Sequence, residues 1–178
     1  LTRLVNNVLD FSRLEQGRRS YRRETFDLAA FLRGFLADHQ ARLSAAGLVL
    51  RAELPNASLA VLAERDALNQ ILLNLMDNAA KYAASGRELE VSLIPVTRHA
   101  ELRMADRGPG VPAAHRARIF DKFHRVDDSL TASHPGSGLG LSIARRLARD
   151  LGGELSYEPR PGGGSVFLLT LPLLETLP

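Results

Sequence analysis

Apolar positions in this chain follow two rhythms, and each rhythm predicts one kind of element. Apolar residues spaced three and four apart predict helices over residues 1–17, 28–46, 64–84, 113–122 and 142–151. Short apolar or alternating stretches predict strands over residues 24–27, 48–54, 58–62, 88–96, 101–105, 154–157 and 165–171. Because the strands gather toward the end of the chain with helices between them, we expect an α+β fold. A two-layer α/β sandwich is favoured over a parallel doubly wound sheet.

The composition is that of an ordinary globular protein. The 178 residues are 45% hydrophobic and 24% charged, and the absence of cysteine excludes a disulfide framework and cysteine metal sites. The net charge of +3 comes mostly from scattered arginines and aromatic residues make up only 6%, so no nucleic-acid partner is expected. No apolar run approaches the roughly eighteen residues needed to cross a bilayer. Since the first residue is leucine, we expect a piece of a longer protein, and the absence of cysteine suits a location in the cytoplasm.

A row of polar residues stands on the helix predicted over residues 64–84. Asn74, Asn78 and Lys81 follow helical spacing on a different face from the apolar stripe that contains Leu75. Amide oxygens can join the coordination shell of magnesium, and a lysine can meet phosphate as a point charge. A helix face that touches solvent would show the same row, so the row by itself leaves both interpretations open.

A short glycine motif follows the strand predicted over residues 101–105. Asp106 stands at the end of the strand, and Gly108 and Gly110 allow the backbone to approach a ligand closely. A carboxylate in this place can accept a hydrogen bond from an exocyclic amine, which would contribute about 1.5–3 kcal/mol. A simple turn that begins with aspartate would use the same residues.

A second glycine motif precedes the helix predicted over residues 142–151. Residues 136–141 read Gly-Ser-Gly-Leu-Gly-Leu, and glycines before a helix N-terminus expose backbone amides to an anion. The motif lacks the lysine and hydroxyl residue of a P-loop and the upstream strand of a dinucleotide fingerprint. A flexible hinge is therefore an equal alternative to a phosphate site.

Two aromatic residues, Phe120 and Phe123, lie between the glycine motifs. Arg125 follows them, and the polar loop predicted over residues 126–135 is long enough to be a lid. Arg125 is placed to reach a phosphate across this lid, whereas the two phenylalanines are equally expected in the core. The glycines of residues 162–164 are expected to form a plain turn.

In this order, the motifs resemble the catalytic ATP-binding domain of bacterial sensor histidine kinases. The matching residues read Asn-Leu-x-x-Asn-Ala-x-Lys-Tyr from residue 74, Asp-x-Gly-x-Gly from 106, Ile-Phe-x-x-Phe from 119 and Gly-x-Gly-Leu-Gly-Leu from 136. The resemblance implies a mixed sheet packed against three helices, the Bergerat-type ATP-binding fold. Residues 1–17 resemble the last helix of the dimerisation and phosphotransfer domain of these proteins. The implied division is that helix, a linker over 18–23 and the ATP-binding domain over 24–178.

The resemblance implies a role for each residue on the phosphate side. Asn78 matches the magnesium ligand of the family, and Asn74 and Lys81 match its phosphate-side partners. Tyr82 matches a residue that packs near the nucleotide. Arg125 is expected to supply the phosphate contacts that family lids take from several basic residues, because the loop here offers only a histidine.

The resemblance also implies how the base and the lid are held. Asp106 matches the carboxylate that hydrogen-bonds the adenine amino group, with Gly108 and Gly110 beside the base. Phe120 and Phe123 match the aromatic pair that anchors the lid. The residues implied at the lid's end and the phosphate site are Gly136, Gly138, Leu139, Gly140 and Leu141.

The implied activity is that of an ATP-dependent protein-histidine kinase in a two-component system. The γ-phosphoryl group of ATP moves to a histidine on the phosphoacceptor helix of the same homodimeric protein, and a response regulator is the next partner. None of the five histidines here matches that acceptor, so the chain is not expected to label itself. One alternative is an ATP-hydrolysing machine such as gyrase B or MutL, which carry glutamate at the position of Asn74. The other is a nucleotide-binding module without catalytic activity.

Overall fold

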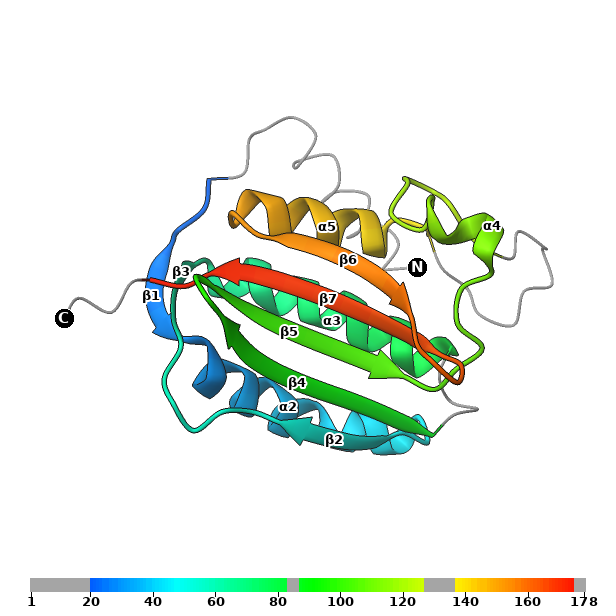
Figure 1. Cartoon of the computed structure of the whole chain (residues 1–178), viewed down its shortest axis with the longest axis horizontal. Coiled ribbons are helices and arrows are strands. Elements are labelled where there is room, and N and C mark those ends of the chain that lie inside the picture. Colours follow the sequence, from blue (N-terminus) through cyan, green and yellow to red (C-terminus); the bar gives the residue numbers. More distant parts are fainter. Residues whose placement is uncertain (1–19, 83–86, 127–136, 175–178) are drawn as a thin grey trace.

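The structure is a computed structural model of the chain, and it describes residues 20–82, 87–126 and 137–174. The helix predicted over residues 1–17 and nearly all of the predicted lid lie outside these ranges, and the domain boundaries stay predictions. The helices are α2 (Leu28–Ala45), α3 (Arg65–Tyr82), α4 (Ala113–Arg116) and α5 (Gly140–Asp150) (Figure 1). The strands are β1 (Glu24–Asp27), β2 (Val49–Glu53), β3 (Ala60–Ala63), β4 (Glu88–Val96), β5 (His99–Asp106), β6 (Glu154–Pro159) and β7 (Ser165–Pro172). Among the described helices, none combines the length and the apolar character that a membrane span requires.

Five strands form a mixed sheet that is covered by helices on one face. The strand order is β2–β4–β5–β7–β6, with β2 parallel to β4 and every other pair antiparallel. Helices α2, α3 and α5 lie together on one face of this sheet (Figure 1). The predicted α+β fold, a two-layer sandwich with a mixed sheet packed against helices, is confirmed.

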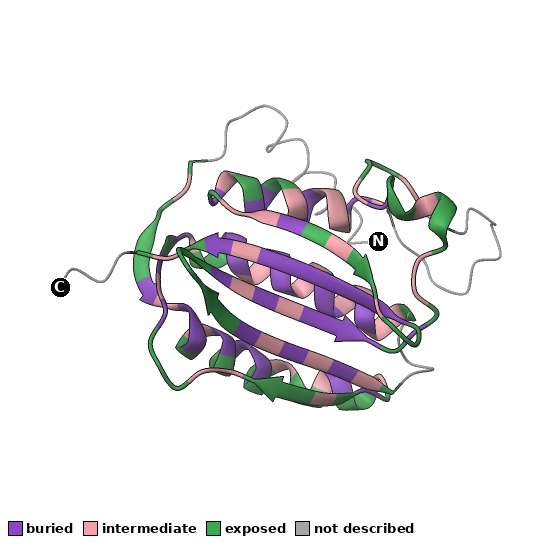
Figure 2. Cartoon of the chain, in the orientation of Figure 1, coloured by how far each residue is buried: buried purple, intermediate pink, exposed green. Residues whose placement is uncertain are grey.

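The alternation along the strands decides which side chains meet the helices. In β4, Leu89, Val91 and Leu93 are buried, whereas the residues between them are only partly buried (Figure 2). The apolar stripe of α3 belongs to the same buried core, and Leu68 and Leu75 on it are 0% and 2% exposed. Each such buried side chain stabilises the fold by about 1.5–3 kcal/mol. The helices are thereby fixed in register with the sheet, and the polar row of α3 is fixed with them.

A separate two-stranded sheet joins the start of α2 to the segment before α3, and sequence analysis did not foresee this pairing. Strand β1 pairs antiparallel with β3. The carboxylate of Asp27 accepts hydrogen bonds from the amides of Ala29 (2.9 Å) and Leu59 (3.1 Å), so it caps α2 as expected and also ties the two segments together. Burial acts to raise the pKa of Asp27, but these amides, with Leu59 foremost, outweigh it and hold the pKa below its ordinary value.

Two predicted helix boundaries are wrong at the same end of the molecule. The helix predicted over residues 113–122 ends at Arg116, because the chain then forms tight turns in which the amides of Arg118, Asp121 and His124 each donate to a carbonyl three residues back. The helix predicted from residue 142 begins instead at Gly140, and its first bond joins the Ile143 amide to the Leu139 carbonyl at 2.9 Å. The second glycine motif therefore runs directly into the N-terminus of α5.

Candidate functional site

The polar row predicted on α3 lies at the border between the core and the solvent. Asn74, Asn78 and Lys81 are all partly buried, and Tyr82 at the end of the helix is 51% exposed. The row belongs to a helix whose other face is packed on the sheet, so these side chains have a fixed backbone beneath them. They are thus held in place on the side of α3 that the sheet does not cover.

Asn74 meets the second glycine motif at the start of α5. Helices α3 and α5 pack against each other, and a Cβ placed on Gly140 would lie 3.4 Å from the Asn74 Oδ1 atom. Within the described residues, the Nδ2 atom of Asn74 is buried and has no hydrogen-bond partner. A buried amide donor without a partner costs about 1–3 kcal/mol. This place therefore favours a ligand with acceptor oxygens, next to the amides of a helix N-terminus.

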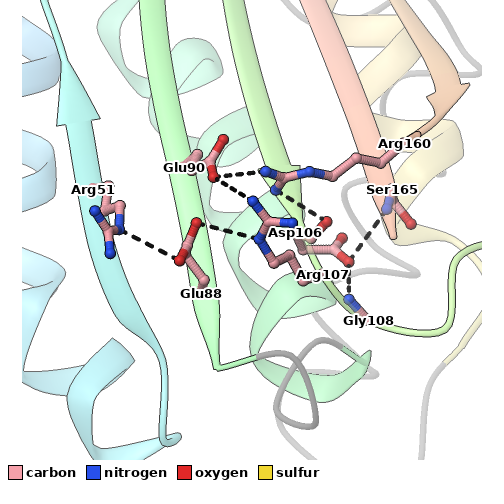
Figure 3. Close-up of polar contacts among 8 residues, drawn as sticks. All are labelled: Arg51, Glu88, Glu90, Asp106, Arg107, Gly108, Arg160 and Ser165. Atoms are coloured by element: carbon pink, nitrogen blue, oxygen red, sulfur yellow. Dashed lines mark hydrogen bonds and ion pairs between the residues drawn. The ribbon is translucent and has the colours of Figure 1, made fainter. Parts of the chain in front are cut away.

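Asp106 is the last residue of β5 and is only 7% exposed. Its Oδ1 atom accepts hydrogen bonds from the amides of Gly108 (2.7 Å) and Ser165 (3.3 Å) (Figure 3). Burial raises the pKa of this carboxyl above its ordinary value, although the two amides act in the opposite direction. The first glycine motif is thus a turn that begins with Asp106, as the simple-turn interpretation of the sequence predicted. This turn also holds a buried carboxylate at the end of a strand.

The glycine-rich segment of residues 162–164 is more than the plain turn that we expected. Gly164 has φ of +114°, and a Cβ on it would lie only 2.0 Å from the backbone oxygen of Asp106. No other residue type fits so close to a backbone carbonyl. This turn and Ser165 after it are part of the Asp106 site that sequence analysis missed. The signal was present in the run Gly-Gly-Gly-Ser at the start of a predicted strand.

The aromatic pair and the second glycine motif meet at the two ends of the segment 127–136. The Phe123 amide donates to the Gly138 carbonyl at 3.1 Å, and a Cβ on Gly138 would lie 2.7 Å from the Phe123 carbonyl carbon. Phe123 itself has φ of +61° and is 63% exposed, whereas Phe120 packs against the core. The guanidinium of Arg145, on α5, lies 4.8 Å from the centre of the Phe120 ring. The two motifs are therefore joined at Phe123 and Gly138.

For most of the remaining predicted residues, the structure gives their burial and packing contacts. Gly108 is buried, and Gly110 packs against the Gly164 carbonyl. Leu139 is fully buried, Leu141 packs against the core and Arg125 is partly buried after the aromatic pair. Gly136 lies outside the described residues.

Chain connectivity places the asparagine row and Asp106 at the same end of the sheet. Helix α3 ends at Tyr82, and β4 begins six residues later at Glu88. In the ladder between β4 and β5, Leu89 lies opposite Asp106. The C-terminal half of α3, the end of β5 and the glycine-rich turn thus converge. Together they form a candidate site with a carboxylate at one end and amides at the other.

Comparison with known proteins identifies the family of this site. Residues 63–175 match the model of the histidine kinase-, DNA gyrase B- and HSP90-like ATPases. The chain is 33% identical over 171 residues to the sensor protein KdpD and 31% identical over 177 residues to the signal transduction histidine-protein kinase BaeS, both of Escherichia coli. These alignments cover 96% and 99% of the chain, but only 19% of KdpD and 38% of BaeS. The chain thus spans less than half the length of these relatives.

Solved structures agree with the sequence relatives. The full-length ShkA structure in complex with AMPPNP matches 98% of the chain with a TM-score of 0.83 and 30% identity, and the chain covers 36% of it. The histidine kinase AdeS of Acinetobacter baumannii matches with a TM-score of 0.77 and 26% identity over 98% of the chain and 79% of AdeS. This chain belongs to the histidine kinase-, DNA gyrase B- and HSP90-like ATPase family, and it is an ATP-binding domain of the sensor histidine kinase type.

Proposed function

We propose that this domain binds magnesium-ATP and supplies the γ-phosphoryl group to a histidine on a phosphoacceptor helix of its own full-length protein. That protein would be a cytoplasmic or membrane-anchored sensor kinase that works as a homodimer and passes the phosphoryl group to a response regulator. The family match and the likeness to a histidine kinase bound to AMPPNP support this proposal. In such a transfer the protein chiefly positions the groups and neutralises charge, and the acceptor histidine is the nucleophile.

The observation that carries this proposal is the chemistry of Asn74. Asn74 lies against the start of α5, where ATP phosphates would meet helix amides. Within the described residues, its Nδ2 atom is a buried donor without a hydrogen-bond acceptor. An ATP-hydrolysing relative needs a carboxylate at this position to activate water. A carboxamide has no useful basicity for that task. The amide therefore favours transfer to an external acceptor over hydrolysis.

Magnesium fits this site as part of the nucleotide substrate. Among the described residues, no group of three or more histidine, cysteine or acidic side chains is arranged to hold a metal. Mg²⁺ is commonly held by one or two protein oxygens together with phosphates and water. The partly buried Asn78 offers one such oxygen, one helical turn from Asn74. Lys81 and Arg125 would then meet the phosphates as cations.

The decisive test supplies the missing acceptor. The chain is mixed with a separately produced phosphoacceptor-helix domain from its full-length protein and with ATP labelled in the γ-phosphate. We expect acid-labile and base-stable label on the acceptor histidine, and none on the chain alone. Release of inorganic phosphate with no label on the acceptor would instead support the ATPase alternative.

A second test addresses the metal. Asn78→Ala is expected to abolish the magnesium dependence of ATP binding, measured by calorimetry with and without Mg²⁺. Asn69→Ala is the matched control, because Asn69 lies on the same helix and is also partly buried but stands outside the motif. If both variants keep the magnesium dependence of the parent chain, Asn78 is not the ligand.

A further inference from the structure

The face of the sheet that the helices do not cover, here called the outer face, carries a cluster of charged side chains next to Asp106. Arg160, in the turn between β6 and β7, reaches Glu90 on β4, with 2.6 Å between Nη2 and Oε1 (Figure 3). Arg107 lies beside this pair, and its Nη2 atom is 3.5 Å from the same Glu90 oxygen. Glu90 lies opposite Ala105 in the ladder, one residue before Asp106. Because neighbouring residues of a strand point to opposite faces, the charge cluster and the Asp106 carboxylate lie on opposite faces of the sheet.

Arg160 is more deeply placed than a surface arginine. Its side chain is 11% exposed, compared with 49% for Arg107. A guanidinium that is largely removed from water requires its partners, because losing one leaves an uncompensated charge. The second partner is the backbone oxygen of Asp106, which accepts a long hydrogen bond of 3.4 Å from Nη1.

The backbone of Arg160 also closes the glycine-rich turn. Its amide donates to the Gly164 carbonyl at 3.2 Å, and its carbonyl accepts from the Gly163 amide at 3.0 Å. Gly164 is the residue that packs on the Asp106 carbonyl. One residue therefore holds both the turn and the strand end that it covers.

We propose that Arg160 and Glu90 are positioning residues for adenine recognition. Their ion pair fixes the end of β5 from the outer face, so that the Asp106 carboxylate is held in place for the base on the inner face. This inference rests on the proposed binding of ATP and on the role that the family resemblance implies for Asp106, a hydrogen bond to the adenine amino group. Neither Arg160 nor Glu90 is on the nucleotide's side of the sheet, so their effect falls on base selectivity and not on phosphate binding.

The test compares ATP with GTP, which carries an oxygen where ATP carries the amino group. Both affinities are measured by calorimetry for the parent chain, Arg160→Met and Arg160→Lys. Arg160→Met is expected to lower ATP affinity about tenfold and to leave GTP affinity nearly unchanged, so the ATP/GTP ratio also falls about tenfold. Arg160→Lys keeps the charge and should restore part of the ratio. An equal fall in both affinities would mean that Arg160 has a structural role only, and it would overturn the inference.

Two further variants serve as a control for charge and as a second test of the ion pair. Arg107→Met removes a charge from the same cluster without a contact to the Asp106 carbonyl, and the ratio should stay within about twofold because exposed ion pairs contribute little. Glu90→Gln keeps the shape of the side chain and removes its charge, and it should lower the ratio in the same direction as Arg160→Met. Glu90→Gln decides the question if Arg160→Met does not fold, and an unchanged ratio in it would then reject the proposal.

The Asp106→Asn variant separates the two levels of the proposal. In that background, Arg160→Met should have no further effect on the ratio, because residues that act through one another are not additive. If Asp106→Asn lowers the ratio and Arg160→Met does not, the positioning role is wrong and the role of Asp106 stands. If Asp106→Asn leaves the ratio unchanged, the proposed role of Asp106 fails as well, while phosphoryl transfer to the acceptor is tested independently.

Discussion

The Asp106 end of the site and the Asn74 end differ in how their polar groups are satisfied before a ligand binds. The Asp106 carboxylate accepts hydrogen bonds from two backbone amides. The glycine-rich turn packs so closely on the Asp106 backbone that only glycine fits at position 164. The Asn74 Nδ2 atom is buried and, within the described residues, has no partner. Near that end, Phe123 holds a left-handed backbone conformation, which costs a non-glycine residue about 1–3 kcal/mol.

This difference separates a preorganised region from one that the ligand completes. At the Asp106 end, the contacts that would orient the base also hold the fold together, so damage there affects stability and binding at once. At the Asn74 end, an unpaired donor lowers stability without ligand and, in the proposed function, would gain its partner on binding. The two ends should therefore respond to substitution with opposite signs of stability change.

The largest effect is expected for Gly164→Ala. Its Cβ would overlap the Asp106 carbonyl at φ of +114°, so we expect a loss of about 2–4 kcal/mol in unfolding free energy and a loss of ATP binding. Urea unfolding and calorimetry measure the two quantities. Gly162→Ala is the matched control, because Gly162 also has a positive φ of +83° but nothing within 4 Å, and it should cost only about 1–2 kcal/mol. Equal losses in the two variants would show that the close contact with Asp106 is unimportant.

Asp106→Asn should weaken ATP binding with the fold intact. The amide still fills the site, but it would lose the proposed charge-assisted bond to the adenine amino group, which would contribute about 1.5–3 kcal/mol. Calorimetry measures the affinity, and circular dichroism confirms the fold. Unchanged ATP affinity would remove Asp106 from the binding site.

Asn74→Ala should lower ATP affinity while leaving the chain without nucleotide as stable as before or more stable. The substitution removes a buried donor that lacks a partner, and the gain should be at most about 1 kcal/mol because some packing is lost as well. Thermal unfolding with and without ATP measures both effects. A clear loss of stability without nucleotide would contradict the contrast between the two ends.

The smallest effect concerns pH. Burial raises the pKa of Asp106 in the folded chain above its value in the unfolded chain, so its contribution to stability is fully present below the unfolded pKa and is lost as pH rises through the folded pKa. Relative to Asp106→Asn, the parent chain should therefore gain stability on acidification toward pH 4. Its ATP affinity should fall over the same window, because protonation removes the charge. Unfolding and binding measured from pH 7 to pH 4 on both chains would reveal these opposite trends.

Patterns within single segments of the sequence predicted much of the fold and part of the candidate site. The helical spacing of Asn74 and Asn78 and the place of Asp106 at a strand end are visible within single elements, and the structure keeps those placements. The helix predicted past Arg116 and the late start predicted for α5 were wrong because apolar spacing does not report the tight turns after Arg116 or the bond from the Ile143 amide to the Leu139 carbonyl. The Phe123 amide pairs with the Gly138 carbonyl fifteen residues away, and no local spacing reports this.

The sequence by itself determined the order of helices and strands, the polar row on α3, the two glycine motifs and the resemblance to sensor histidine kinases, because each is written in short-range spacing. Only the tertiary structure decided that β1 pairs with β3, that the glycine-rich turn covers Asp106, and that Arg160 reaches Glu90 across 70 residues of chain. Side-chain periodicity sets which face of an element is buried. It does not set which distant backbone will pack against that element, because this depends on how all the strands close into one sheet.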